Sequence, residues 1–382
     1  MATQFAMDVQ QEQTGKEITG QRQAAAPPTF QAQVISSAAE LSSLAAELEK
    51  LDVFATCPMQ SYRWTQACSQ SFTEDTPCIL LLRCEGEVVA YAALAQPAGE
   101  KRLLSLGHQL FEPTVFAYAD QSAGAALSSA ILELSRPIFL RDVYVSFSIG
   151  EAVKTACLGK RICIERPMPA HPWLELDQSW LEPEQQLNSG RRSDLRRARK
   201  QAVKQGAISY LIERLTPANV DAHMEEVFEV ESRNWKGRAG SAMSKTPAIQ
   251  QFYRTYARMA AEQGIARVLM MRIGETTVAV QFGVEFNHRF WLLKMGYDET
   301  FSRCSPGILL MVESLRYATE CGLKIYEMMG VQESWNQIWT ESAHEAFSLR
   351  IYAPGVRGLM AAGSEMVRIG LRKAAQKQRR EK

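Results

Sequence analysis

The chain has 382 residues, of which 46% are hydrophobic and 22% are charged, and its formal net charge is +1. Domains usually comprise roughly 100–200 residues, so this length and composition predict an ordinary soluble protein with two cores. The near balance of charges excludes a global attraction to nucleic acid or to a membrane surface, and any such partner has to be recognised by a local patch.

Cysteine and histidine usage argues against disulfide and metal sites. The eight cysteines form no CxxC pair and several stand in apolar runs, which is typical of free thiols in a reducing compartment. The five histidines show no HxxxH or HExxH spacing, so we expect no metal site. The sequence shows no secretory signal, and no apolar stretch approaches the ~20 residues of a membrane span, so we expect a cytoplasmic protein.

The N-terminal half opens with a polar segment, residues 1–34, that we expect to be disordered. Ser37 and Glu40 then fit a capping box, and leucines follow at helical spacing. A second amphipathic helix is predicted over 60–71. Residues 78–95 form two apolar runs around a Glu-Gly turn, which indicates a β-hairpin.

The same hairpin pattern returns over 266–286, again around a turn that contains glycine. Moving the first hairpin forward by 189 positions aligns the two without a gap, and Arg83 then falls on Arg272. Either any two hairpins look alike, or the chain contains two related α/β halves. We adopt the second interpretation as a hypothesis, because each hairpin follows a predicted helix with aromatic residues.

The predicted organisation places a boundary near 168–190, where prolines cluster. A first unit covers 35–180, a second unit covers 190–365, and a basic tail over 366–382 follows. The second unit is predicted to contain helices over 191–205, 217–235, 248–263 and 307–321, and strands over 266–273, 278–286, 289–295 and 324–328.

The helix predicted from Gly307 begins in a way that suits an anion. Ser305 is a favourable N-cap residue, and Pro306 suits the first helical position. Unpaired amides at this end and the helix dipole attract a phosphate, and Gly307 lets it approach the backbone closely. The tripeptide alone is compatible with a helix start that binds nothing, but the flanking strands favour the anion site.

Short motifs in a fixed order carry a resemblance to a known family. They are Arg192–Lys200, Glu231–Trp235, Phe252-Tyr253, Val278-Ala279, Gly296-Tyr297-Asp298, Ser305-Pro306-Gly307 and the segment from Gly322 through Glu327 to Gly330. Over roughly 190–350 the chain resembles the GNAT-related acetyltransferases of cellulose and exopolysaccharide biosynthesis, which are related to the FemAB-type aminoacyl transferases. The N-terminal half resembles, more loosely, the degenerate first GNAT unit of such proteins.

The resemblance implies two tandem GNAT-like units, each a mixed, mostly antiparallel sheet flanked by helices. It also implies acyl transfer from acetyl-CoA or another acyl-CoA, with direct attack by the acceptor. A backbone amide of the strand containing Leu293, Met295 and Gly296 would polarise the thioester. The CoA pyrophosphate would lie against Arg303, Ser305, Pro306, Gly307, Ile308 and Leu309.

Three glutamates are candidates for the general base. Glu231 stands among apolar residues of a predicted helix, Glu285 lies in the second hairpin, and Glu327 occupies a position where the family often has Asp. A partly buried carboxylate can have a raised pKa suited to proton removal, although each of the three is also compatible with a structural role. Tyr297 either donates a proton to the leaving thiolate or merely packs.

The candidate substrate-binding residues are Arg192, Arg196, Trp235 and Trp335. The basic helix is either a solvated face or a cationic rim for a phosphorylated acceptor or the CoA 3′-phosphate. The tryptophans either line the acceptor cleft or belong to the core. We expect a small-molecule or saccharide acceptor and no nucleic acid, since no aromatic residues interleave the basic run.

Two alternative functions remain open at this level. One is FemAB-like aminoacyl transfer from charged tRNA, which the basic helix would serve. The other is a catalytically inactive GNAT pair that acts as a scaffold or regulatory protein.

Overall fold

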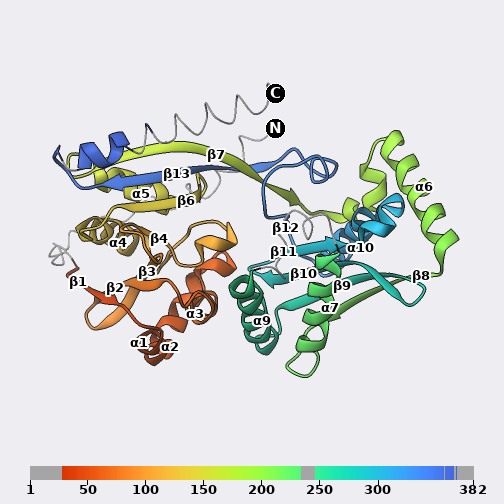
Figure 1. The fold of residues 1–382 in the computed structure, drawn as a ribbon, viewed down its shortest axis with the longest axis horizontal. Coiled ribbons are helices and arrows are strands. Elements are labelled where there is room, and N and C mark those ends of the chain that lie inside the picture. The colour runs from red at the N-terminus through yellow and green to blue at the C-terminus, as the bar shows by residue number, and fades with distance from the viewer. Residues whose placement is uncertain (1–27, 234–245, 357, 365–366, 368–382) are drawn as a thin grey trace, which may run out of the picture.

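The computed structural model describes residues 28–233, 246–356, 358–364 and 367. Two halves lie side by side, each a sheet covered by helices (Figure 1). The N-terminal half contains β1 (Phe30–Ile35), α1 (Ala38–Ser43), α2 (Ala45–Leu48), α3 (Tyr62–Ser71), β2 (Thr76–Cys84), β3 (Glu87–Gln96), β4 (Leu103–Ser105), β5 (Ala117–Tyr118), α4 (Gln121–Glu133), β6 (Ile138–Tyr144), α5 (Ser148–Cys157) and β7 (Ile162–Glu175).

The C-terminal half repeats the order of a strand, helices, a hairpin and a long helix. It contains α6 (Ser189–Gln205), β8 (Ile208–Arg214), α7 (Val220–Ser232), α9 (Pro247–Glu262), β9 (Ala266–Ile273), β10 (Thr276–Phe286), β11 (Arg289–Tyr297), α10 (Pro306–Glu320) and β12 (Ile325–Glu327), and β13 (Ala343–Tyr352) follows. None of the helices within the described ranges is long and apolar enough to cross a bilayer.

The strands form one continuous sheet in the order β1-β2-β3-β4-β6-β13-β7-β12-β11-β10-β9-β8, and β5 pairs with β3. Within the described chain, β4 pairs with β6 and β11 pairs with β12 in parallel, and the other pairings are antiparallel. The predicted α/β fold, with mixed and mostly antiparallel sheets flanked by helices, is therefore confirmed.

The strand registers of the two halves match, which supports the predicted repeat. Between β2 and β3 the register shifts between Leu82 and Arg83. Between β9 and β10 it shifts between Met271 and Arg272, which are the positions 189 residues later. A bulge is a specific backbone feature, so its recurrence at the matching place favours two related halves over a chance likeness of hairpins.

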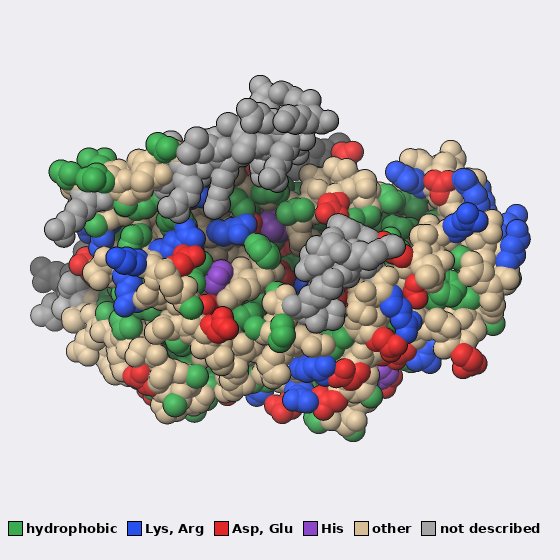
Figure 2. Space-filling view, in the orientation of Figure 1, with side chains coloured by type: hydrophobic (Ala, Val, Ile, Leu, Met, Phe, Trp, Pro, Cys, Tyr) green, Lys and Arg blue, Asp and Glu red, His purple; other side chains and the backbone are tan. Residues whose placement is uncertain are grey.

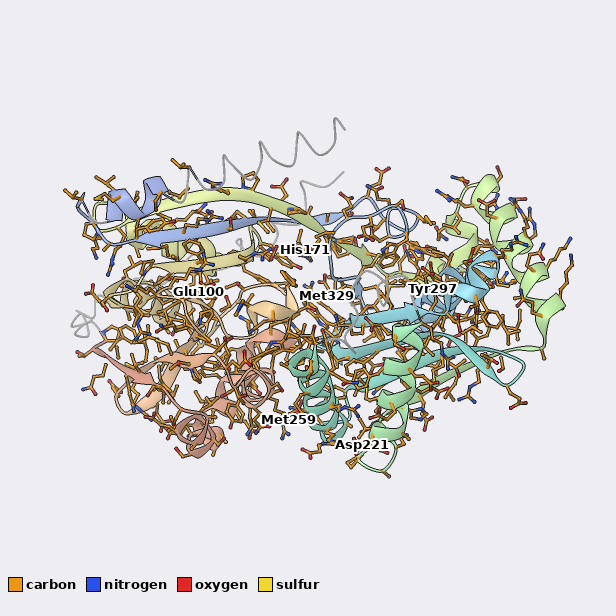
Figure 3. All side chains as sticks on the ribbon, viewed as in Figure 1. Glu100, His171, Asp221, Met259, Tyr297 and Met329 are labelled. Atoms are coloured by element: carbon orange, nitrogen blue, oxygen red, sulfur yellow. The ribbon has the colours of Figure 1, made fainter. Side chains whose placement is uncertain are left out.

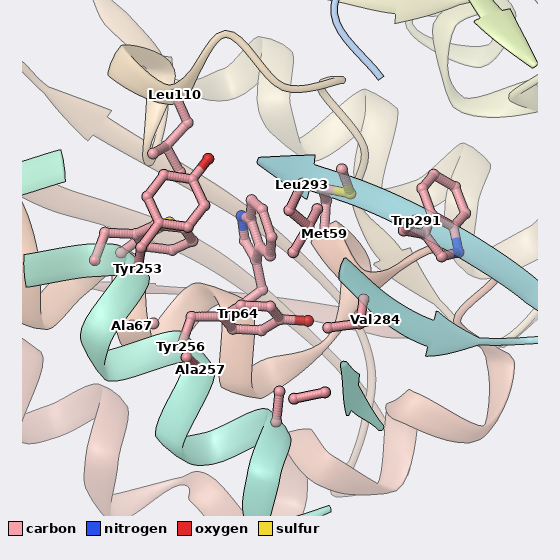
Figure 4. Close-up of a cluster of buried hydrophobic side chains, with 14 of the residues drawn as sticks. Met59, Trp64, Ala67, Leu110, Tyr253, Tyr256, Ala257, Val284, Trp291 and Leu293 are labelled. Carbon is pink, nitrogen blue, oxygen red and sulfur yellow. The ribbon is translucent and has the colours of Figure 1, made fainter. Parts of the chain in front are cut away.

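One hydrophobic core crosses from one half to the other (Figure 4). Trp64 of α3 meets Phe252 and Tyr256 of α9 edge-on, with ring centroids 4.8 Å apart in both pairs. Leu293 of β11 and Met329 belong to the same buried cluster. Because buried aromatic side chains contribute strongly to stability, this shared core holds the two halves in a fixed relation.

The segment predicted to be disordered, residues 1–34, extends too far at its C-terminal end. Residues 30–34 belong to β1, which pairs with β2 from Phe30–Cys84 to Ile35–Ile79. Only the last residue of this edge strand is buried, so its sequence lacks the apolar alternation that marks a strand. The rest of the predicted segment, 1–27, lies outside the described residues. Ser37 caps α1 as predicted, since its Oγ accepts from the Glu40 amide at 3.2 Å.

The strand β13 differs from the expected division of the chain. The range 190–365 assigns it to the second unit, but it pairs with β6 and β7 of the N-terminal half. Phe347, Leu349 and Ile351 are buried in the core of that half. Figure 1 shows β13 running back beside β7. The physical reason is that β6 and β7 each need a partner strand, and the apolar face of β13 fits between them.

The proline-rich stretch is a strand rather than a linker. β7 runs through Pro167, Pro169 and Pro172, and its end, Trp173–Glu175, pairs with β12 of the C-terminal half. Over its proline-containing part β7 pairs with β13 alone among the described strands. Proline is tolerated where one edge of a strand needs no N–H donor, so the prolines here do not break the strand.

Candidate active site

A cleft opens where β11 and β12 separate. The two strands pair in parallel over three residues, which end at Trp291 and Glu327, and β11 then continues with β10 as its partner. Leu293 has no partner on β10, because the register shifts at this point. Such a bulge increases the local twist. Because the pairing with β12 ends at Trp291, β11 has one open edge over 292–297, the edge that faces away from β10. The backbone amides on this edge pair with no described strand.

Three adjoining cavities follow this edge. The inner cavity, of about 240 Å³, is lined by Leu110, Phe111, Glu112, Glu231, Leu292, Leu293, Lys294, Met295, Met328, Met329, Gly330, Val331, Glu333 and Trp335. The middle cavity, of about 270 Å³, is lined by Met295, Gly296, Tyr297, Ser302, Ser305, Pro306, Gly307, Ile308, Glu333 and Trp335. The outer cavity, of about 280 Å³, is lined by Leu187, Arg191, Asp194, Leu195, Arg197, Ala198, Arg303, Ser305, Ile308 and Ile338.

Shared walls join these cavities into one groove. Met295, Glu333 and Trp335 line both the inner and the middle cavity. Ser305 and Ile308 line both the middle and the outer cavity. Figure 3 shows Met329 of the inner cavity near the middle of the molecule and Tyr297 of the middle cavity farther into the C-terminal half.

The start of α10 forms the floor of the middle cavity, but its capping differs from the prediction. Ser305 occupies the N-cap with a left-handed backbone, φ 45°, and its side chain makes no capping bond. The amides of Ile308 and Leu309 donate to the Ser305 carbonyl, so the cradle has fewer open amides than predicted. A Cβ added at Gly307 would meet Tyr297 at 3.5 Å, an ordinary contact, so the Gly307 backbone borders open space.

The start of α4, the helix of the N-terminal half that corresponds to α10, is capped by its own N-cap side chain. α4 begins after Asp120, whose Oδ1 accepts from the Ala123 amide at 2.8 Å. A carboxylate at this place satisfies the helix dipole internally and repels a phosphate. In the described structure, the start of α10 thus has a free approach for an anion, whereas the start of α4 does not.

Glu231 lies at the cleft, as the choice of a base requires. It belongs to α7, its side chain is 4% exposed, and it lines the inner cavity with Leu293. A Cβ on Gly296 would stand 2.9 Å from the Cα of Glu231, so glycine is needed there for α7 to approach β11. The carboxylate is therefore held beside the unpaired edge of β11.

The other two glutamates have structural partners. Glu285 lies at the far end of β10, where its carboxylate accepts from Arg267 at 2.5 Å and from the Tyr317 hydroxyl at 2.7 Å. It lines none of the three cavities. Glu327 accepts from Arg289 at 2.6 Å and lies 3.0 Å from Nε2 of His344, and this pair ties β12 to β13. Of the three candidate glutamates, Glu231 is the one that lines a described cavity of the groove.

The remaining predicted residues divide between the groove and the core. Leu293, Met295, Gly296, Tyr297, Arg303, Ser305, Pro306, Gly307, Ile308 and Trp335 line the groove. Leu309 is a fully buried residue of α10, so its side chain belongs to the core instead. Trp235 lies outside the described residues.

The basic helix α6 docks by its apolar face, as predicted, with Leu195 and Ala198 buried. Lys and Arg side chains gather on its outer surface (Figure 2). Arg192 and Arg196, predicted to bind substrate, line none of the three cavities, and Arg191 and Arg197 line the outer cavity instead. Residues 191, 194, 195 and 198 share the face of α6 that meets α10, and this explains why Arg191 rather than Arg192 lines the outer cavity.

Two charged residues of the inner cavity, Glu112 and Lys294, were not among the predicted site residues. Glu112 comes from the N-terminal half, so no local motif marks it. Burial raises the pKa of Glu112 to about 7, against the opposing charges of Lys294 and His171. The only sequence signal is its place in a segment without regular structure between two predicted strands.

The raised pKa of Glu112 predicts a pH-dependent stability. The folded protein holds this proton more tightly than the unfolded chain, so the free energy of unfolding falls as pH rises from about 4.5 to about 7. Glu112→Gln removes this fall, and we expect the variant to gain roughly 1–3 kcal/mol relative to the parent between pH 5 and pH 8. Urea denaturation at both pH values measures the difference.

Glu74→Gln is the control for this experiment, because Glu74 is exposed and lines none of the three cavities. It should follow the parent at both pH values. Equal pH slopes for Glu112→Gln and the parent would show that Glu112 ionises normally.

Comparison with known proteins agrees with this geometry. Residues 189–337 match the family model described as the acetyltransferase (GNAT) domain. No curated protein sequence matches the chain. The solved structure of FemX is 13% identical, with a TM-score of 0.55, and the match covers 85% of this chain and 97% of that one. A conserved protein of unknown function from Bacteroides thetaiotaomicron VPI-5482 is 11% identical, with a TM-score of 0.52, over 85% of this chain and 99% of that one.

At these identities the two solved structures establish a shared fold across most of the chain. The family match lies on the half that holds the groove, α10 and Glu231. Residues 189–337 of this chain are thus similar to a GNAT acetyltransferase domain.

Proposed function

We propose that the protein transfers an acetyl or other acyl group from acyl-CoA to an amine or hydroxyl acceptor. The observation that carries the proposal is the continuous groove, which joins an open helix start, the unpaired edge of β11 and the buried carboxylate of Glu231. An extended thioester with phosphates at one end has the shape and charge pattern of this groove.

The residues present suit acyl-CoA. The backbone at Gly307 is accessible from the middle cavity, where a pyrophosphate would bind. Arg191, Arg197 and Arg303 line the outer cavity, where guanidinium groups suit the phosphates at the nucleotide end. The β11 edge at Leu293 would receive the thioester carbonyl, and its amide would stabilise the oxyanion.

The chemistry follows from these positions. The acceptor nitrogen or oxygen attacks the thioester carbon, a bond forms between them, and the carbon–sulfur bond breaks. Glu231 takes the proton of the attacking group, and the departing thiolate takes a proton from the Tyr297 hydroxyl. Both side chains then return to their starting states by exchange with solvent. Orientation in the groove supplies most of the remaining rate enhancement.

The acceptor class follows from the resemblance noted in the sequence. A saccharide or a saccharide precursor fits an acceptor site with an aromatic wall, and Trp335 supplies such a wall where the middle and inner cavities meet. A second candidate, aminoacyl transfer from charged tRNA, is favoured by the FemX-like fold and the exposed cations of α6.

Thermal denaturation in the presence of candidate ligands tests the proposal. Acetyl-CoA should raise the melting temperature. Stabilisation by charged tRNA alone would favour the aminoacyl reaction. No response to either ligand, combined with a specific protein partner in a pull-down, would favour the scaffold alternative.

The outer cavity gives a second, sharper test. Among the described residues, Arg191 and Arg303 have no ion-pair partner, and both face this cavity. If they hold the 3′-phosphate of CoA, the parent binds CoA more tightly than 3′-dephospho-CoA, by roughly tenfold. The double variant Arg191→Ala/Arg303→Ala should lose this preference, as measured by calorimetry.

The matched control removes Arg192 and Arg196, which belong to the same helix but line none of the cavities. It should keep the preference. Equal binding of the two nucleotides by the parent would exclude a 3′-phosphate site in the outer cavity.

A further inference from the structure

A short helix after β13 exposes large apolar side chains. Residues 358–364 are helical, and Val356 and Val367 on either side have a helical backbone as well. Val356, Val367 and the neighbours Leu359 and Met360 are between 61% and 73% exposed. Twelve large hydrophobic residues of the described chain are strongly exposed, and four of them fall within this one segment. Single exposed apolar residues are ordinary on a protein surface, but a cluster of them marks an interaction site.

The helical repeat places these side chains on one face. Leu359 and Met360 follow Val356 by three and four positions, which is about one turn, so the three side chains point to the same side. Val367 follows Val356 by eleven positions and has the same phase. We call these four side chains the apolar face. Figure 2 shows hydrophobic side chains gathered at the upper left of the molecule, where Figure 1 shows the helix that follows β13.

The opposite side of this helix is packed on the protein. Ala362 is 6% exposed and belongs to a buried cluster with Phe139 and Tyr352. A Cβ on Gly358 would collide with the carbonyl oxygen of Ala353, so glycine is needed for this close approach. Small residues thus face inward and large apolar residues face outward, which is the reverse of an ordinary surface helix. The helix cannot turn its apolar face inward without losing these contacts.

The sequence that follows this helix is strongly basic. Residues 368–382 contain seven cations against the single anion Glu381, whereas the whole chain has a formal net charge of only +1. The seven cations are Arg368, Arg372, Lys373, Lys377, Arg379, Arg380 and Lys382. An apolar helix face next to a run of cations is the pattern of a segment that binds the surface of an anionic membrane.

We propose that the apolar face and the basic residues 368–382 together dock the protein on the surface of a bilayer that contains anionic lipids. The four apolar side chains enter the boundary between headgroups and acyl chains, and the cations pair with the headgroup phosphates. The helix lies along the surface and does not cross it. This inference goes beyond the proposed acyl transfer and does not depend on it.

Other occupants fit the apolar face less well. Stable protein interfaces bury roughly 1,200–2,000 Å² in total, which is far more than four side chains supply to a dimer. Two copies joined there would also bring two basic segments together, and like charges repel. A nucleic acid would pair with the cations and leave the apolar face in water. An anionic lipid surface matches both features.

Vesicle co-sedimentation with the full chain tests the proposal. One set of vesicles consists of phosphatidylcholine alone, and in the other set phosphatidylglycerol replaces roughly a third of it. We expect the parent to bind the anionic vesicles roughly tenfold or more tightly than the neutral ones. High salt should weaken this binding, because it screens the attraction between the cations and the headgroups.

The double variant Leu359→Gln/Met360→Gln removes half of the apolar face and keeps the charge. Both side chains are exposed and glutamine is a good helix former, so the thermal midpoint should stay close to that of the parent. Affinity for the anionic vesicles should fall roughly tenfold or more. The control Val53→Gln/Phe54→Gln replaces two exposed apolar residues directly after α2, at the lower edge of the molecule in Figure 1, and should bind as the parent does.

The triple variant Arg372→Gln/Lys373→Gln/Lys377→Gln tests the charge and keeps the apolar face. It should bind the anionic vesicles roughly tenfold or more weakly than the parent. Its binding to the neutral vesicles should be unchanged, because phosphatidylcholine carries no net charge.

Three results would each overturn the proposal. The first is a parent that does not bind the anionic vesicles. The second is equal binding by the parent and by Leu359→Gln/Met360→Gln, since the basic residues would then attract anions without the apolar face. The third is a dimer, detected by light scattering, that Leu359→Gln/Met360→Gln dissociates, since the apolar face would then belong to a second copy. Failure of acetyl-CoA to bind would contradict the proposed function alone.

Discussion

Replacing Gly307 by Glu should abolish acetyl-CoA binding and leave the protein folded. The glycine backbone borders the middle cavity, and the nearest side chains to an added Cβ are Tyr297 at 3.5 Å and Met295 at 4.0 Å. A glutamate therefore fits only by extending into the cavity, where its charge repels a pyrophosphate. Calorimetry should show at least a hundredfold loss of affinity, with a thermal midpoint close to that of the parent.

Gly307→Ala is the matched control for this experiment. A methyl group meets ordinary contacts at this position and Gly307 has no left-handed backbone, so the variant should bind acetyl-CoA within a fewfold of the parent. Its stability should equal or slightly exceed that of the parent, because alanine restricts the unfolded chain. Unchanged affinity in Gly307→Glu would remove the basis of the assigned pyrophosphate site.

Glu231→Gln should lower kcat by roughly 10²–10⁴, the usual contribution of a general base, and leave acetyl-CoA affinity nearly unchanged. The amide keeps the size of the side chain, so α7 can keep its close approach to Gly296. The loss should shrink at high pH, where a larger fraction of an amine acceptor is already deprotonated. Steady-state kinetics at two pH values measures both effects.

Glu285, another of the three candidate bases, provides the comparison for the Glu231→Gln variant. Glu285→Gln breaks an ion pair with Arg267 at the far end of β10 and should lower stability more than kcat. If Glu285→Gln lowered kcat as much as Glu231→Gln did, proton removal could not be assigned to Glu231.

Local patterns were sufficient to predict most elements of the fold. Apolar runs around a Glu-Gly turn predicted both hairpins, and the capping pattern at Ser37 predicted the start of α1. These signals lie within a few residues of the structure that they specify. β7 and β13 were missed, because the prolines of β7 read as breaks and the partners of β13 lie far away in the sequence.

The same distinction applies to the groove. Gly307 and Glu231, which line the groove, could be proposed from the sequence because each stands in a recognisable motif of its own half. Glu112 was not found, since only the packing of one half against the other brings it to the cavity. The arginines of α6 that line the outer cavity are Arg191 and Arg197 rather than the predicted Arg192 and Arg196, because the side that faces α10 depends on how the helix docks.

The return of β13 to the N-terminal half affects how the chain is made. During synthesis the first half leaves the ribosome before residues 343–352 have been made. Over that interval β6 and β7 lack the strand that pairs with both of them in the folded protein. Contacts between segments so distant in the sequence form slowly, and the unpaired strand edges of the incomplete chain can associate with other chains. The nascent first half should therefore depend on chaperones until synthesis is complete.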